Sequence, residues 1–243
     1  MFCKNCGKEI DDNSDFCNFC GSNLKEENFQ KRKKNKKPVI VIVILVLIIG
    51  LIIGGIVIIN IKKNNEQMER EYHDLLIKTG AKLYVSEMAT EAHAAYITKV
   101  WYNAIFEKRD AYTDEYIYID KYGTGFKFNV TFSEAIENYL TKNKTQISKL
   151  KEYKNEIQED MIKLQQTPNS EYSSALNSIQ NMYAKFNTLL DLLSSPTGAY
   201  KDYAEKWHGY SEDFKSEYDK LIVLIPEISQ ENIEKEKEEL ILK

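Results

Sequence analysis

All four cysteines of the chain lie near its N-terminus, in two short units of the same form. The units are Cys3-Lys4-Asn5-Cys6-Gly7 and Cys17-Asn18-Phe19-Cys20-Gly21, and a phenylalanine precedes each of them. A tetrahedral zinc site takes four soft ligands at about 2.3 Å, and two Cys-x2-Cys turns supply four thiolates. The spacing therefore predicts one structural Zn²⁺ ion held by Cys3, Cys6, Cys17 and Cys20. Since four protein ligands leave no position for water or substrate, we expect no reaction at this metal.

A redox role is the usual alternative for an isolated Cys-x2-Cys pair, and the doubled motif disfavours it. So short a segment cannot bury enough surface to fold without such a metal. Residues 2–21 resemble the short zinc ribbons at the N-termini of many bacterial membrane proteins, which implies zinc on the same cysteines and implies no activity. The segment carries two lysines against four acidic residues, a net charge of −2. We therefore expect a protein partner for it, and no nucleic acid.

The next segment is an unbroken apolar run, Val39 to Ile59, without a charged or hydrogen-bonding side chain. A helix of this length spans roughly the 30 Å hydrocarbon core of a bilayer. A cleaved signal peptide would have a shorter apolar core that starts nearer residue 1, followed by a small-residue cleavage site. The run therefore predicts a single transmembrane helix, within residues 38–61.

A basic stretch precedes the apolar run and predicts its orientation, because cationic flanks stay on the cytoplasmic side. It consists of Lys31, Arg32, Lys33, Lys34, Lys36 and Lys37. We expect these side chains to contact anionic lipid headgroups as well. The N-terminal zinc segment, residues 1–24, and the linker 25–37 would then be cytoplasmic, and residues 62–243 would lie outside the cytoplasm.

Gly50 and Gly54 form a GxxxG pattern inside the apolar run, which permits close approach of two helices in lipid. The same spacing also arises by chance in apolar sequences. A homodimer through this face is therefore one of two interpretations.

Beyond the span, apolar periodicity predicts a mostly α-helical domain over residues 62–226, an antiparallel bundle with short connections. Residues 64–109 read either as one long helix with a weak point at Gly80 or as a stalk followed by a packed helix. Helices at 133–166, 172–193 and 200–225 follow. The first of these is expected to start at the N-cap Ser133, and seven of nine positions on its 3.5-residue period are apolar, as in a coiled coil. The charged tail, 227–243, reads as a frayed or weakly docked helix.

The connection 110–132 breaks the helical pattern and reads equally well as a small hairpin or as an irregular aromatic loop. Long connections in bundles are often functional, so ligand contacts are expected here. The tyrosines singled out for such contacts are Tyr112, Tyr116, Tyr118 and Tyr122. Together, Val100 to Ile105, the Thr167-Pro168 turn and Ser195 to Gly198 resemble uncharacterised extracytoplasmic helical proteins of Firmicutes, which implies a surface-exposed helical domain and no known activity.

No catalytic constellation is visible in the outer part. His73, His93 and His208 belong to no metal-binding pair, and there is neither a Gly-x-Ser-x-Gly motif nor a thiol beyond the span. Glu236, Glu238 and Glu239 are interpreted as a solvated helix face. The leading hypothesis is a single-pass protein that links an outer recognition or sensing domain to a cytoplasmic zinc-ribbon adaptor. The alternatives are a structural envelope-associated coiled-coil spacer and, more remotely, an extracytoplasmic enzyme.

Overall fold

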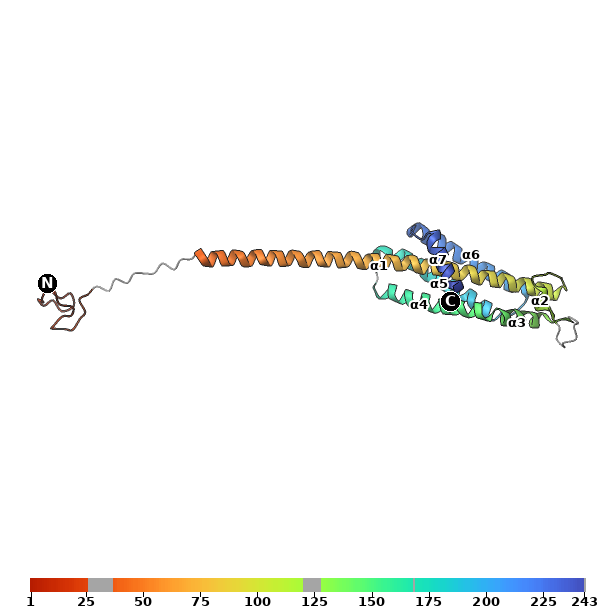
Figure 1. Cartoon of the computed structure of the whole chain (residues 1–243), viewed down its shortest axis with the longest axis horizontal. Helices are drawn as coiled ribbons and strands as arrows, with labels where there is room; N and C mark the ends of the chain where they lie inside the picture. The colour runs from red at the N-terminus through yellow and green to blue at the C-terminus, as the bar shows by residue number, and fades with distance from the viewer. Residues whose placement is uncertain (26–36, 120–127, 168, 243) are drawn as a thin grey trace. The chain divides into compact units, whose positions relative to one another are not determined.

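Helix α1 (Lys37–Ile105) is the longest element of the computed structural model, at 69 residues. The structure describes residues 1–25, 37–119, 128–167 and 169–242. It divides into two compact units, Met1–Asn60 and Ile61–Lys243, which are considered separately below. Both units are shown in Figure 1, where most of the chain is helical.

The part of α1 that belongs to the first unit carries the apolar run. Among the described residues, α1 is the one helix long and apolar enough to cross a membrane, with a mean hydropathy of 2.6 in its most apolar window. None of that window is buried inside the protein. An unburied apolar stretch of this length costs free energy in water, since each exposed leucine or isoleucine forgoes about 1.5–3 kcal/mol of burial. The finding therefore indicates a membrane protein.

The second unit is a helical bundle around one main core. Its elements after α1 are α2 (Asp114–Ile117), β1 (Tyr118–Ile119), β2 (Phe128–Asn129), α3 (Phe132–Lys142), α4 (Lys144–Gln166), a 3₁₀ turn η1 (Ser170–Tyr172), α5 (Ser173–Ser194), α6 (Tyr200–Leu224) and α7 (Gln230–Leu242). In Figure 1, α4, α5 and α6 run alongside the C-terminal part of α1. Helices α5 and α6 pack directly on each other, as their short connection predicts.

Residues 64–105 form part of one continuous helix, which agrees with the first of the two expected readings. Gly80, however, is a packing position and not a weak point. A Cβ atom added there would lie 2.9 Å from both Ile228 Cδ1 and Leu221 Cδ2. The glycine lets the end of α6 and the residues after it approach α1 closely.

The predicted helix 133–166 is two helices, and its predicted N-cap is wrong. Thr131 is the N-cap of α3, and it forms a capping box with Glu134. The break falls at Asn143, whose side-chain amide donates a hydrogen bond of 2.9 Å to the carbonyl oxygen of Tyr139. Asparagine side chains compete for backbone groups in this way and so interrupt helices. The apolar stripe itself does face the core, and Tyr153 and Asp160 are buried beside it.

The C-terminal tail forms a docked helix, so of its two expected readings the frayed one is wrong. Ile228 and Ile233 are buried, and Ile233 forms a small separate cluster with Ala81 and Val85 of α1. The hydroxyl of Tyr153 in α4 donates to the carbonyl oxygen of Glu236 over 3.3 Å. Glu236 is only 3% exposed, so the predicted solvated face is corrected at this residue.

The connection 110–132 contains the small hairpin that was one of its two expected forms. Its strands β1 and β2 are antiparallel, with Tyr118 opposite Asn129 and Ile119 opposite Phe128. Residues 120–127, and with them the predicted ligand contact Tyr122, lie outside the described residues.

Candidate metal centre

The N-terminal segment uses the same turn twice. Cys3 N–H donates to the carbonyl oxygen of Lys8 at 2.9 Å, and Cys17 N–H donates to that of Ser22 at 3.0 Å. Isolated β-bridges pair Phe2 with Glu9 and Phe16 with Asn23, at equivalent positions of the two turns. Gly7 and Gly21 have φ angles of +69° and +70°, a conformation that side chains disfavour. The glycine after each cysteine pair therefore allows each turn to close.

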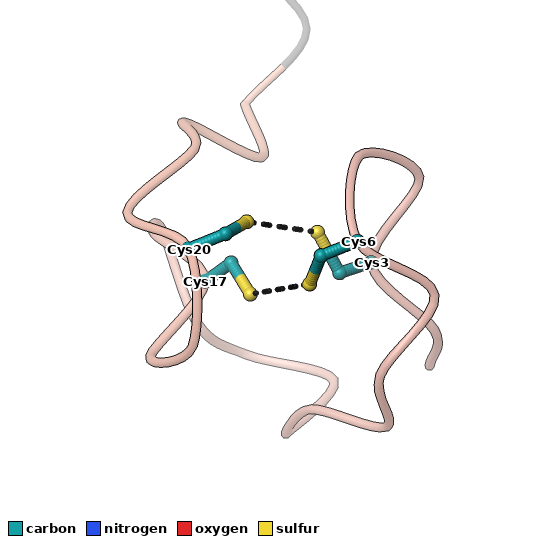
Figure 2. Close-up of side chains that lie close together, drawn as sticks. All are labelled: Cys3, Cys6, Cys17 and Cys20. Atoms are coloured by element: carbon teal, nitrogen blue, oxygen red, sulfur yellow. Dashed lines mark hydrogen bonds between the residues drawn. The ribbon is translucent and has the colours of Figure 1, made fainter.

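These two turns place all four sulfur atoms around one point (Figure 2). The Sγ atoms of Cys3 and Cys20 are 3.7 Å apart, and those of Cys6 and Cys17 are 3.6 Å apart. All four lie within 4.8 Å of one another. A regular tetrahedron with zinc–sulfur bonds of about 2.3 Å has edges of about 3.8 Å, so this spacing suits a single Zn²⁺ ion. The predicted ligand set is thus brought together as one zinc-binding site.

Electrostatics at Cys3, Cys6 and Cys20 also favour a cation. The Ser22 hydroxyl lies 3.2 Å from Cys20 Sγ, and this hydrogen bond lowers the pKa of that thiol to about 6. The same hydroxyl, 3.4 Å from Cys3 Sγ, lowers the pKa of Cys3. A hydrogen bond to the Lys8 backbone lowers the pKa of Cys6. Desolvation and the three neighbouring thiols together outweigh this bond and raise the pKa to about 12. Several thiolates cannot crowd together unless a metal cation neutralises them, and Zn²⁺ would do so.

The surface of the ribbon is both apolar and charged. Three phenylalanines, Phe2, Phe16 and Phe19, are exposed to 69%, 58% and 60%. The amino group of Met1 pairs with Asp12, and Lys25 Nζ lies 3.0 Å from an Asp15 oxygen. Exposed aromatic rings of this kind are enriched at protein interfaces.

The residues predicted to meet lipid or to form a dimer lie around the apolar run. Lys31, Arg32, Lys33, Lys34 and Lys36 lie outside the described residues, and Lys37 begins α1. Gly50 and Gly54 lie on α1, and a Cβ atom added at either would meet no atom within 4 Å. The dimer and the lipid contacts remain predictions.

The predicted ligand contacts in the connection 110–132 differ in exposure. Tyr112 is 71% exposed, whereas Tyr116 is buried. The ring of Tyr116 packs edge-on against Tyr139, with centroids 5.1 Å apart. The ring of Tyr118 lies under Arg109, whose Cζ is 4.0 Å from its centroid. Tyr116 is therefore a core residue, and Tyr112 is the accessible tyrosine of the three that the structure describes.

Two buried charged groups on α1 carry no signal in the sequence pattern. Lys82 is 3% exposed, and its Nζ lies 3.0 Å from Glu156 Oε2 and 3.4 Å from Asp160 Oδ2. Glu87 is 1% exposed and accepts a hydrogen bond of 2.6 Å from the Ser211 hydroxyl. Desolvation raises the pKa of Glu87 to about 7. Thr79, Ser86 and Thr90 are also buried on α1. Partners on α4 hold the Lys82 amine, and Ser211 on α6 satisfies one oxygen of Glu87.

The three histidines have separate surroundings in the bundle. His93 Nδ1 lies 2.7 Å from the Tyr139 hydroxyl, and burial lowers the pKa of His93. His73 Nε2 lies 3.7 Å from Glu227 Oε2, and the ring of His208 stacks on that of Trp207. Among the described residues, only the four cysteines are grouped closely enough to hold a metal ion.

A hollow of about 680 Å³ lies between the start of the bundle's α1 segment and the end of α4. Two of its charged side chains already form polar contacts with neighbouring residues. Lys163 pairs with Asp160 at 3.0 Å, and Glu71 accepts a hydrogen bond of 2.9 Å from Gln67. The hydroxyl of Tyr72, a further lining residue, is buried.

Comparison with known proteins gives information on the N-terminal cysteine segment. Residues 2–24 match the zinc-ribbon domain family. No curated protein and no solved structure gives a significant match to the chain. The N-terminal segment is therefore a zinc-ribbon domain, on the sulfur geometry and on this match together.

Proposed function

We propose that the chain is a single-pass membrane protein that links an extracytoplasmic helical recognition or sensing domain to a cytoplasmic zinc-ribbon adaptor. The observation that carries the proposal is the order of its parts: a four-thiolate ribbon, an unburied apolar helix of mean hydropathy 2.6, then a bundle with its own core. An apolar helix between two folded units is the arrangement that a membrane requires when each unit works in water.

The proposed orientation rests on charge and on the cysteines. Seven basic residues occupy positions 25–37, against three at positions 60–72, which favours a cytoplasmic N-terminus. Thiolate ligands are stable in a reducing compartment, and the chain has no cysteine beyond Cys20. The bundle then lies outside the cytoplasm and needs no disulfide.

The adaptor role rests on the closed zinc site and on the exposed phenylalanines. A site with four thiolates supplies folding free energy and not chemistry, so the ribbon acts through its surface. Phe2, Phe16 and Phe19 are apolar rings held by a rigid framework, which is how binding surfaces gain affinity at low entropic cost. We assign no catalytic role to either unit.

The experiment is recovery of partners from detergent extracts of cells that express the full chain. Wild type is compared with Cys3→Ser/Cys6→Ser, which removes the ribbon fold, and with Phe2→Ser/Phe16→Ser, which leaves the four ligands in place. We expect a specific protein to be recovered with wild type and lost, at least tenfold, with both variants. Equal recovery with all three proteins would contradict the adaptor role.

A structural spacer is the second candidate, and the continuous 69-residue helix α1 favours it. A spacer would self-associate and would show no saturable stabilisation by a small ligand. A sensor is stabilised by its ligand in proportion to the logarithm of the ligand concentration. Melting curves of the full chain with and without ligand therefore separate the two.

A further inference from the structure

A small charged hollow lies between α1 and the C-terminal helix α7. Its volume is about 280 Å³, and since a water molecule takes about 30 Å³ of liquid, it suits a ligand of about nine heavy atoms. Its lining residues are Asp74, Ile77 and Lys78 of α1 and Asn232, Lys235 and Glu236 of α7. The two walls come from opposite ends of the bundle's sequence, and docking of α7 creates the hollow.

The charges around this hollow are balanced but unpaired. Each wall carries one carboxylate and one amine, Asp74 with Lys78 and Glu236 with Lys235. Among the described residues, none of these four side chains forms a salt bridge or a side-chain hydrogen bond, although all four residues line the same hollow. Surface helices commonly pair opposite charges at this i,i+4 spacing, so the absence of pairing at Asp74 and Lys78 is notable.

Glu236 is the residue that most needs a partner. It is 3% exposed, and its Oε2 atom is buried without a hydrogen-bond partner. The nearby amine of Lys82 is already held by Glu156 and Asp160, at 3.0 Å and 3.4 Å. Desolvation is the main cause that raises the pKa of Glu236, and repulsion from Glu239 adds to it. The amines of Lys82, Lys78 and Lys235 oppose the shift. A buried carboxylate without a donor costs free energy that a bound ligand can recover.

Asn232 contributes an amide whose position is fixed. Its Oδ1 accepts hydrogen bonds from the backbone N–H and the hydroxyl of Ser229, at 2.9 Å and 2.8 Å, at the start of α7. With Oδ1 engaged, the amide nitrogen of Asn232 is the group left for a ligand. Because the capping bonds fix its orientation, little entropy is lost when it donates.

We propose that this hollow binds a small zwitterion of the amino-acid class, whose carboxylate meets Lys78 and Lys235 and whose ammonium meets Glu236 and Asp74. A simple anion of the same size would be repelled by the two carboxylates, and a simple cation by the two amines. Ile77 is the one apolar residue of the lining, so the site favours a ligand with a short side chain.

Such a ligand would fasten α7 to α1. Docking of α7 rests on a small apolar cluster and also buries the Glu236 carboxylate, so α7 is weakly held without a ligand. A bound zwitterion satisfies that carboxylate and bridges the two helices. The inference supplies a ligand class for the recognition role proposed above, and binding itself does not require the ribbon to have a partner.

The test is hydrogen exchange of residues 230–242 in the full chain, reconstituted in lipid nanodiscs. Glycine and each of the other standard amino acids are added singly at 10 mM, with sodium acetate and methylammonium chloride as the two half-ligand controls. We expect at least one amino acid to slow exchange in α7 about tenfold or more, and neither half-ligand to do so. No slowing by any amino acid, or equal slowing by acetate or methylammonium, would overturn the proposal.

Three variants sharpen this result. Glu236→Gln removes the buried charge, so α7 should exchange more slowly without ligand and should show no further slowing when the amino acid is added. Lys78→Gln changes an exposed residue and should abolish the ligand effect while leaving the bundle folded. Glu238→Gln, on the exposed side of α7, should respond as wild type.

A full ligand effect in Glu236→Gln or Lys78→Gln would contradict the site. Slowing of α7 by an amino acid, together with equal partner recovery for the wild-type ribbon and its variants, would uphold the site and contradict the adaptor role.

Discussion

The zinc ribbon and the helical bundle place their charged groups in opposite ways. In the ribbon, the farthest ligands, Cys3 and Cys20, are 17 residues apart, and the turns that hold them are local. In the bundle, Lys82 meets Asp160 at a separation of 78 residues, and Glu87 meets Ser211 at 124. A site built from adjacent turns is therefore encoded in spacing, whereas a site built between helices is encoded only in their packing.

Removal of zinc should have the largest effect and should divide the two regions. Structural zinc contributes about 10–16 kcal/mol to the folding of small zinc domains, so a chelator or Cys17→Ser/Cys20→Ser should unfold the ribbon completely. The bundle contains no metal-ligand cluster among its described residues and should keep its melting temperature. Hydrogen exchange before and after chelation measures unfolding of the ribbon, and thermal denaturation measures the melting temperature of the bundle. A bundle that melts at a lower temperature after chelation would show that its fold depends on the ribbon.

Glu87→Gln should stabilise the bundle, with an effect that depends on pH. The folded-state pKa of Glu87, about 7, exceeds its ordinary value of 4.5, so the folded protein binds more protons between these values. Stability therefore falls as pH rises from 4.5 to 7 and stays reduced above pH 7. The difference between the two pKa values corresponds to a destabilisation of roughly 3 kcal/mol above pH 7. Glutamine removes this destabilisation because it is uncharged, and it still accepts the hydrogen bond from Ser211. Denaturation at pH 5 and pH 8 measures it.

The matched control for that experiment is Glu212→Gln on α6, where the side chain is exposed. Its stability should follow the wild-type pH dependence. If Glu87→Gln keeps the wild-type slope between pH 4.5 and pH 7, the buried carboxylate is not the titrating group.

Gly80→Leu should destabilise the bundle by about 1–3 kcal/mol, because the new side chain would overlap Leu221 and Ile228. Gly209→Leu is the matched change, since a Cβ atom there meets nothing within 4 Å. That variant should gain up to about 1 kcal/mol from helix propensity. Thermal denaturation compares the two, and a stabilised Gly80→Leu would show that the close packing of α1 is absent.

Glu107→Gly should give the smallest change. Glu107 has a φ angle of +49° just after α1, where Lys108 N–H donates to the carbonyl oxygen of Asn103 at 3.0 Å. A non-glycine residue in this left-handed conformation costs about 1–2 kcal/mol, so glycine should stabilise the bundle by about 1 kcal/mol. A loss of stability on urea denaturation would mean that the glutamate side chain holds the turn.

Much of the fold could be predicted from the sequence, because local patterns encode it. The cysteine spacing predicts the ribbon, the unbroken apolar run predicts a helix within residues 38–61, and the periodic stripes predict the faces of α4, α5 and α6. The errors arose where one side chain decides the outcome. Asn143 splits a helix whose apolar stripe continues across it, and Gly80 reads as a flaw until the side chains opposite it are known.

The hollow between α1 and α7 could not be predicted for a related reason. Asp74 and Lys78 look like any exposed pair on a helix, and Glu236 lies in a charged tail that resembles a solvated face. Two isoleucines, Ile228 and Ile233, dock that tail, and the Glu236 side chain is buried with them. No spacing in the sequence distinguishes this glutamate from its neighbours.

The proposed function requires the two regions to lie on opposite sides of a membrane. The direct measurement is protease treatment of intact cells that express the full chain, followed by detection of each region with its own antibody. We expect residues 61–243 to be cut, while the ribbon, residues 1–25, stays protected until the membrane is permeabilised. Cleavage of the ribbon in intact cells, with the bundle protected, would contradict it.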